Sequence, residues 1–255
     1  MIKKRLVVAN WKMNPSSAME ARELFSAVKK VSSTLKNIKL VICPPDIYFY
    51  DLKRLSRGKN IALGAQNAFG EKAGQVTGEI PPSMLAEIGI EYIIVGHSER
   101  RAFGETDEEI NRKLKALLEL GFKCILCVGE KERDEDGEYL GFIRNELRED
   151  LRGVNKKRYK NLIIAYEPVW AIGKDSQKAD TPESVEQVSV FIKRVVSMMV
   201  GRDIGLNLSI LYGGSVDEDN AGDFLKTGGL DGLLVGRASL NKNKFSGILK
   251  KVDKI

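Results

Sequence analysis

Short apolar segments alternate with longer amphipathic segments along the whole chain, and this alternation constrains the fold more than any other feature. The apolar segments have the nearly continuous apolar character of β-strands that are buried on both faces of a parallel sheet. They span residues 6–10, 39–43, 62–66, 92–95, 124–128, 162–166, 209–212 and 232–235. The clearest amphipathic segments have apolar residues three and four positions apart, and they span residues 17–35, 106–120, 182–200 and 217–226. The pattern therefore predicts an α/β fold.

Eight β/α units in a chain of this length indicate a closed (β/α)8 barrel, with eight parallel strands ringed by helices. Such a barrel typically takes about 250 residues, and this chain has 255. No Pro-, Ser- or Gln-rich stretch is long enough to act as a linker, so we expect a single barrel domain over residues 1–255. An open doubly wound sheet is the alternative. An open sheet binds its ligand at the one point where the strand order reverses. Here polar residues follow strand after strand, as in a barrel.

The charge balance argues against nucleic acid and for a small anionic substrate. The chain has 41 Lys and Arg against 35 Asp and Glu, a net charge of +6, but the basic residues are scattered. Nucleic-acid binding requires them to be gathered on one surface. The N-terminal apolar run is interrupted at Asn10 and Lys12, too early for a signal peptide, and no later run approaches the ~18 apolar residues of a membrane span. With three cysteines, an odd number, we expect a cytoplasmic protein that does not bind membranes.

Two strand ends carry residues suited to acid–base chemistry. Glu167 directly follows residues 162–166 and precedes Pro168, which favours extended backbone at Glu167 and so aims its carboxylate. His97, the only histidine, follows residues 92–95 ahead of a predicted helical turn. Helix amides near an imidazole disfavour its cation, so His97 could act as a neutral hydrogen-bond donor. A lone histidine is more often structural, but a place at the barrel rim favours a role in catalysis.

Lys12 follows the first strand, where it would project a fixed cation over the barrel mouth, able to pair with a phosphate or a developing oxyanion. Glu99 is expected to lie close enough to hold Lys12 by an ion pair. The alternative for Lys12 is a surface lysine beside a core tryptophan. The alternative for Glu99 is a solvated acid, partly paired with Arg100 or Arg101. The residues alone leave these alternatives open.

Glycine-bearing turns follow the seventh and eighth predicted strands. Their sequences are Tyr212-Gly213-Gly214-Ser215 and Gly236-Arg237-Ala238-Ser239, and each leads toward a helix. Exposed backbone N–H groups next to a helix start make a binding site for phosphate. Barrel enzymes repeatedly bind phosphate after strands seven and eight, so the two turns together predict a phosphate site.

Cys124 and Cys127 form a C-x-x-C pattern of the kind found in metal and redox sites. On a strand, however, residues three apart face opposite sides, and the sequence has no second cysteine pair to complete a zinc site. We therefore expect no metal and no redox role.

Ordered motifs along the whole chain carry a family resemblance. They are Ala-Asn-Trp-Lys-Met-Asn at 9–14, Gly-Ala-Gln-Asn at 64–67, Thr-Gly-Glu at 77–79, Gly-His-Ser-Glu-Arg-Arg at 96–101, Cys-Val-Gly-Glu at 127–130, Ala-Tyr-Glu-Pro-Val-Trp-Ala-Ile-Gly at 165–173 and Tyr-Gly-Gly-Ser-Val at 212–216. Together they resemble the triosephosphate isomerase family. The resemblance implies a barrel enzyme that interconverts dihydroxyacetone phosphate and D-glyceraldehyde 3-phosphate in glycolysis and gluconeogenesis, without cofactor or metal.

The resemblance also implies roles for individual residues. Glu167 would remove the proton α to the carbonyl and return it to the adjacent carbon, while His97 and Lys12 would stabilise the enediolate oxygens. Asn10 would orient the substrate, and Glu99 would hold Lys12. The residues whose backbone N–H groups would bind the substrate phosphate are Gly173, Ser215, Gly236 and Arg237.

Two places depart from the family pattern. The segment at residues 174–180 is longer than the corresponding segment of the family. Asp175 stands where a second glycine of the family's mobile lid is expected. A side chain there restricts positive φ, and its carboxylate would repel the phosphate, so we expect Asp175 to point outward. Arg237 stands where the family commonly has a second glycine, and we expect its side chain to point outward as well.

The loop at residues 69–79 has the composition of a solvated loop, but the resemblance implies that it inserts into a neighbouring subunit of a homodimer. Two other functions remain open at this stage. Another sugar-phosphate barrel would share the phosphate site, and a weakly active paralogue would account for Arg237 and the longer segment. Glu167, His97 and Lys12 in their particular contexts favour the isomerase over both.

Overall fold

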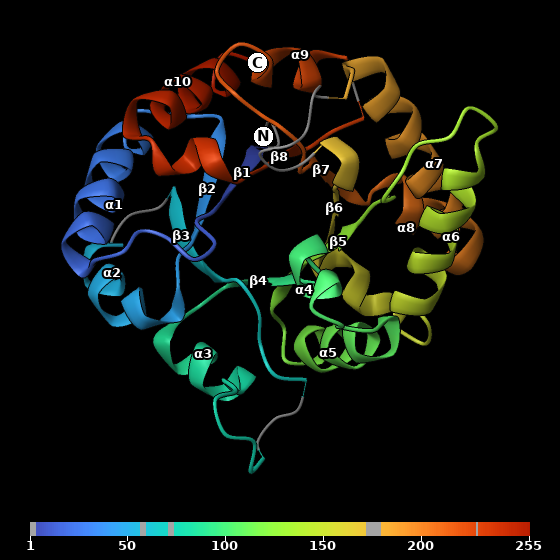
Figure 1. Cartoon of the computed structure of the whole chain (residues 1–255), viewed down its shortest axis with the longest axis horizontal. Helices are drawn as coiled ribbons and strands as arrows, with labels where there is room; N and C mark the ends of the chain where they lie inside the picture. The colour runs from blue at the N-terminus through green and yellow to red at the C-terminus, as the bar shows by residue number, and fades with distance from the viewer. Residues whose placement is uncertain (1–3, 57–59, 71–73, 172–179, 228) are drawn as a thin grey trace.

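The computed structural model describes residues 4–56, 60–70, 74–171, 180–227 and 229–255. Its strands form one closed barrel, in which each strand pairs in parallel with the next and β8 pairs with β1. The helices surround these strands in Figure 1. The strands are β1 Arg5–Asn10, β2 Ile38–Cys43, β3 Ile61–Ala65, β4 Tyr92–Val95, β5 Lys123–Val128, β6 Leu162–Tyr166, β7 Ser209–Tyr212 and β8 Gly232–Val235. The predicted (β/α)8 barrel is confirmed.

Alternate residues of the strands pack into two separate cores. Side chains that point into the barrel, among them Val8, Ile125 and Leu211, form an inner core. The side chains between them pack beneath the helices in an outer core. Because successive strand residues face opposite sides, Cys124 lies in the outer core and Cys127 in the inner one, as the sequence predicts.

Helices and short 3-10 turns connect the strands. The α-helices are α1 Ala18–Ser32, α2 Phe49–Leu55, α3 Pro82–Ile88, α4 Ser98–Ala102, α5 Asp107–Glu119, α6 Glu138–Asp150, α7 Pro182–Val200, α8 Arg202–Leu206, α9 Ala221–Lys226 and α10 Lys242–Val252. The 3-10 turns are η1 Asp46–Tyr48, η2 Lys156–Asn161, η3 Val169–Ala171 and η4 Arg237–Leu240. Within the described ranges, no helix combines the length and the apolar character needed to cross a membrane.

Side-chain caps define the starts of α5 and α7. Thr106 and Glu109 form a reciprocal capping box at the start of α5. Thr181 accepts a hydrogen bond from the Ser184 amide at the start of α7, and Pro182 occupies the first helical position. These caps fix where the helices begin relative to the barrel rim.

The largest boundary difference concerns the helix predicted over residues 217–226. Helix α9 begins only at Ala221, because Asp217 Oδ1 accepts hydrogen bonds from the amides of Asp219 and Asn220. Such a turn competes with a helix for the same backbone groups. The glycine-bearing turn after β7 is therefore followed by an irregular segment and not directly by a helix.

Candidate active site

A cavity of about 490 Å³ opens at the carboxyl end of the strands. Lys12, His97 and Glu167 follow the ends of β1, β4 and β6, and all three line it. The loops after β7 and β8 complete the lining with residues 213–217 and 236–238. Residues far apart in the chain therefore meet at one rim, as barrel geometry requires.

Glu167 is 3 % exposed, and its carboxylate faces the start of α4. Oε1 lies 3.4 Å from Nε2 of His97, and Oε2 accepts a hydrogen bond from the Ser98 amide at 3.3 Å. The backbone is held as well, since the Glu167 amide donates to the carbonyl oxygen of Val128 at 2.8 Å. A carboxylate that can act as a base thus has a fixed place beside an imidazole.

Two glycines make room for Glu167. A Cβ at Gly213 would lie 2.7 Å from Glu167 Cγ, and a Cβ at Gly129 would lie 2.0 Å from the carbonyl oxygen of Glu167. Neither position can hold a side chain without a shift of its neighbours. Gly213, which is predicted to lie in a phosphate-binding turn, therefore also shapes the space around the carboxylate.

His97 is buried at the N-cap position of α4. Its Nδ1 accepts a hydrogen bond from the Glu99 amide at 3.2 Å. A ring nitrogen that accepts a hydrogen bond does not carry a proton, so neutral His97 has its proton on Nε2. Nε2 is the nitrogen that faces Glu167, and His97 lines the cavity.

Lys12 has a left-handed backbone with a φ of 53°, which residues other than glycine rarely adopt. Neighbouring side chains hold this conformation: Asn10 Oδ1 accepts from the Lys12 amide at 3.0 Å, and Gln66 Nε2 donates to the Lys12 carbonyl oxygen at 2.8 Å. Lys12 Nζ lies 2.7 Å from Glu99 Oε1, so the predicted ion pair is present. Because the Glu99 side chain is 55 % exposed, this pair directs the ammonium more than it stabilises the fold.

The turns after β7 and β8 line the cavity with Ser215, Gly236 and Arg237. The Ser215 hydroxyl donates to the carbonyl oxygen of Ala171 at 2.8 Å, which ties the β7 turn to the residues that follow Glu167. A Cβ at Gly236 would lie 3.6 Å from Lys12 Cε, so the β8 turn runs beside the lysine. Arg237 is exposed and begins η4.

Cys127 lies close to the Glu167 carboxylate on the inner side of β5. Burial raises the pKa of the Cys127 thiol well above its usual range, and the negative charge of Glu167 raises it further. Cys127 is therefore a neutral thiol and adds no competing negative charge next to the base.

Gly173, the fourth predicted phosphate contact, and Asp175 lie outside the described residues, so both predictions stay predictions. Asn241 and Lys244 also line the cavity, and they were not predicted as site residues. They are ordinary polar residues around the start of α10, and no local pattern marks them. Among the described residues, no group of His, Cys, Asp and Glu side chains could hold a metal ion.

The fold and the site together define a class of protein. A closed parallel barrel whose rim gathers a buried carboxylate, an imidazole N–H and a lysine is a (β/α)8-barrel enzyme suited to proton transfer on a small anionic substrate. Comparison with protein families identifies the family within this class. The family model described as triosephosphate isomerase matches residues 5–252. This chain belongs to the triosephosphate isomerase family.

Curated relatives match the chain over nearly their full length. The triosephosphate isomerases of Carboxydothermus hydrogenoformans and Fusobacterium nucleatum are each 42 % identical to it, over 98 % and 97 % of this chain and 99 % and 98 % of their own lengths. The triosephosphate isomerase of Aquifex aeolicus is 43 % identical over 96 % of this chain and 98 % of its own. The similarity thus extends over the whole barrel and is not confined to the residues of the cavity.

Proposed function

We propose that this protein interconverts dihydroxyacetone phosphate and D-glyceraldehyde 3-phosphate, a step of glycolysis and gluconeogenesis. The observation that carries the proposal is the separation of 3.4 Å between Glu167 Oε1 and His97 Nε2, in a cavity that Lys12 also lines. A base, a hydrogen-bond donor and a cation are the groups required by isomerisation through an enediolate. Membership of the triosephosphate isomerase family supports the same reaction.

Glu167 is the base in this proposal. Its carboxylate takes a proton from the carbon next to the carbonyl, and the electron pair of that C–H bond forms the double bond of the enediolate. The former carbonyl oxygen takes up the negative charge. The Glu167 carboxyl then returns the proton to the adjacent carbon, where the electron pair of the double bond forms the new C–H bond. The hydroxyl proton on the first carbon moves to the former carbonyl oxygen, so the first carbon becomes the new carbonyl and the reaction consists of proton transfers alone.

His97 and Lys12 stabilise the enediolate oxygens. His97 presents Nε2–H, because its Nδ1 already accepts from the Glu99 amide. Lys12 presents an ammonium whose direction is set by Glu99 at 2.7 Å. Asn10, which is 5 % exposed and lines the cavity, orients the substrate beside them. Donors placed in advance where charge develops stabilise a transition state more than water does.

The substrate phosphate binds the turns after β7 and β8 in this proposal, through the backbone N–H groups of Ser215, Gly236 and Arg237. Their place in the lining of the cavity supports this assignment. Gly173 is expected to contribute a further N–H group. Closely spaced backbone amides carry partial positive charge without a bulky side chain, which suits a phosphate dianion.

A coupled assay with D-glyceraldehyde 3-phosphate tests the proposed activity. We expect turnover by the wild-type protein and a loss of about 10²–10⁴-fold in kcat for Glu167→Gln, which keeps the shape of the side chain but cannot accept the proton. Glu119→Gln is the matched control, because Glu119 is half exposed and pairs with Arg158 at the end of α5. Wild-type turnover no higher than that of Glu167→Gln would refute the isomerase.

We also propose a homodimer that assembles through the loop at residues 69–79. Residues 74–79 are exposed, and a second cavity of about 490 Å³ lies beside Lys12 and Glu99. Met13 and Phe103 line this cavity with exposures of 93 % and 88 %. Because two large apolar side chains are exposed in this one cavity, we expect the loop of a second copy to cover it.

Gel filtration with light scattering tests the dimer. We expect a mass of two chains for the wild-type protein and of one chain for Val76→Asp, since Val76 is 47 % exposed in the loop. Met198→Asp is the control, because Met198 is 76 % exposed on α7 and should leave the mass unchanged. A monomeric wild-type protein would contradict this assembly.

We place the protein in the cytoplasm. Cys43, Cys124 and Cys127 are free and buried, which suits a reducing compartment. Cell fractionation with immunodetection tests this placement, and recovery of the protein in a membrane or secreted fraction would contradict it.

A further inference from the structure

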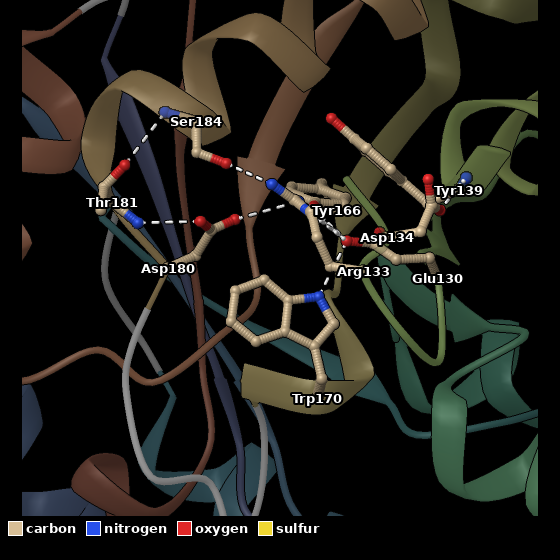
Figure 2. A network of polar contacts seen from close by, with 9 residues as sticks. All are labelled: Glu130, Arg133, Asp134, Tyr139, Tyr166, Trp170, Asp180, Thr181 and Ser184. Atoms are coloured by element: carbon tan, nitrogen blue, oxygen red, sulfur yellow. Dashed lines mark hydrogen bonds and ion pairs between the residues drawn. The ribbon is translucent and has the colours of Figure 1, made fainter. Parts of the chain in front are cut away.

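Arg133, in the loop between β5 and α6, is the centre of a polar cluster next to the candidate active site (Figure 2). Its guanidinium donates to Glu130 Oε1 through Nε at 3.0 Å and through Nη2 at 2.8 Å. It also donates to the hydroxyls of Tyr166 and Ser184, and it lies 3.3 Å from Asp180 Oδ2. One cation thus joins the loop after β5, the end of β6 and the start of α7.

Glu130 connects this cluster to both sides of Glu167. Its side chain is buried, and Oε1 accepts hydrogen bonds from the Tyr166 hydroxyl at 3.0 Å and from Trp170 Nε1 at 2.9 Å. Its carbonyl oxygen accepts from the Val169 amide at 2.9 Å. Tyr166 precedes Glu167, and Val169 and Trp170 follow it. A shift of Glu130 would therefore move the chain on either side of the base.

Asp180 brings a second buried carboxylate to the same guanidinium. Its Oδ1 accepts a hydrogen bond from the Thr181 amide at 2.8 Å, while its Oδ2 faces Arg133. Thr181 in turn caps α7 by accepting from the Ser184 amide at 3.2 Å. Asp180 and Ser184 therefore attach the start of α7 to Arg133 at two points, as Figure 2 shows.

The charges of the cluster make its geometry depend on Arg133. Glu130 and Asp180 are both acidic and buried, and both contact the Arg133 guanidinium. Burial raises the pKa of Asp180, and the positive charge of Arg133 opposes that rise. Burial also raises the pKa of Tyr166, so its hydroxyl stays protonated and donates to Glu130. Removal of the guanidinium would leave two buried carboxylates close together without a counter-charge, which is strongly unfavourable.

We propose that Arg133 and Asp180 are positioning residues for Glu167. Through Glu130 they hold residues 166–170 against the start of α7, and the Glu167 carboxylate thereby keeps its place beside His97. The proposal rests on the isomerase activity proposed above, in which Glu167 is the base. The described residues that line the substrate cavity do not include Arg133 or Asp180, so their effect on the reaction passes through Glu167.

Steady-state kinetics of Asp180→Asn and Arg133→Met test this role. Asp180→Asn removes the charge but keeps an acceptor for the Thr181 amide, whereas Arg133→Met removes the whole guanidinium. Because a displacement of about 1 Å at the reacting groups can lower the rate ~10²-fold, we expect kcat to fall about tenfold for Asp180→Asn and about 10²-fold for Arg133→Met. KM should change less than about threefold, since the phosphate-binding turns are untouched. A substrate deuterated at the carbon that loses its proton should show a larger isotope effect in both variants, because proton transfer limits the rate more.

Asp134→Asn is the matched control. Asp134 adjoins Arg133 and holds the start of α6, with Oδ1 accepting from the Glu138 amide at 2.8 Å and Oδ2 from the Tyr139 amide at 2.7 Å. Its loss should lower the melting temperature through a weaker helix start, without a change in kcat or in the isotope effect. An equal fall in kcat for Asp134→Asn and Asp180→Asn would overturn the positioning role, as would an unchanged isotope effect in Asp180→Asn.

The double variant Arg133→Met/Asp180→Asn shows whether the two residues act through one contact. If they do, the kcat of the double variant should lie within about twofold of that of Arg133→Met alone. A loss in kcat equal to the product of the two single-variant losses would overturn the proposal. Should Arg133→Met fail to fold, Arg133→Lys keeps the charge, loses the multiple hydrogen bonds, and should still lower kcat more than Asp134→Asn. An inactive wild-type protein would refute the proposed function. An active wild-type protein with unchanged kinetics in Asp180→Asn would refute only the positioning role.

Discussion

Glu167 and His97 are held by neighbouring amides of the same helix start: Ser98 donates to Glu167 Oε2 at 3.3 Å, and Glu99 donates to His97 Nδ1 at 3.2 Å. The separation of 3.4 Å between Glu167 Oε1 and His97 Nε2 is therefore set by backbone groups of α4. Side chains that are bound to a rigid element keep their geometry better than side chains that depend on flexible loops. Two amides of one helix start thus hold the carboxylate and the imidazole facing each other.

Substitution of His97 by glutamine should remove most of the activity. Glutamine cannot both accept from the Glu99 amide and present an N–H group where Nε2 stands. We expect His97→Gln to lower kcat by about 10²–10³-fold, as removal of one oxyanion donor does, with little change in KM. Steady-state kinetics measure the effect, and circular dichroism checks the fold. A variant that turns over nearly as fast as the wild type would contradict the role of His97.

The close approach of Gly213 to Glu167 gives a second prediction. In Gly213→Ala the added methyl would lie 2.7 Å from Glu167 Cγ, so the carboxylate or the turn must move. We expect kcat to fall up to ~10²-fold, because the base is displaced. The variant should still fold, and its activity is measured in the coupled assay.

Gly141→Ala is the control for Gly213→Ala. Gly141 lies within α6, and among the described residues nothing beyond its chain neighbours and the adjoining backbone of α6 lies within 4 Å of its added Cβ. Alanine is the better helix former, so this variant should be stabilised by roughly 0.5–1 kcal/mol with an unchanged kcat. Chemical denaturation measures the stability. Equal kcat in the two alanine variants would show that Gly213 does not set the position of Glu167.

The predicted outward direction of Arg237 implies a small effect on binding. Its side chain is exposed at the edge of the cavity. We expect Arg237→Ala to raise KM less than about threefold, because an exposed charge is screened by water and salt. KM is measured at low and at high ionic strength. A steep, salt-sensitive rise in KM at an unchanged melting temperature would mean that the guanidinium reaches the phosphate.

Stability should fall as the pH rises through neutrality because of Asp150 and Glu146. Both are buried beside Arg101, and burial raises the pKa of Asp150 to about 8 and that of Glu146 to about 7. In an unfolded chain such groups have pKa values of about 4. The unfolded chain therefore ionises first, and the stability contributed by the protonated carboxyls is lost between about pH 4 and pH 8.

Thermal unfolding at several pH values measures this effect. Asp150→Asn cannot ionise, so its melting temperature should fall less between about pH 5 and pH 8 than that of the wild type. Glu119→Gln, on the exposed surface of α5, should keep the wild-type slope. Identical slopes for Asp150→Asn and the wild type would contradict the assigned pKa of Asp150.

The barrel could be predicted because its rules are local and repeated. A strand buried on both faces needs a short apolar run, and a helix that covers it needs one apolar stripe. The start of α9 shows the limit of such patterns. Apolar spacing continues through residues 217–220, but the hydrogen bonds that Asp217 Oδ1 accepts from Asp219 and Asn220 keep them out of the helix.

By itself, the sequence determined a closed barrel with Glu167, His97 and Lys12 at its rim, because strand ends in such a barrel converge wherever the chain places them. Only the tertiary structure decided what holds each of them. The hydrogen bond from Gln66 to Lys12 spans 54 positions of the chain, and the contact of Arg133 with Asp180 spans 47. Such contacts depend on how loops pack against one another in space, and no local periodicity encodes that packing.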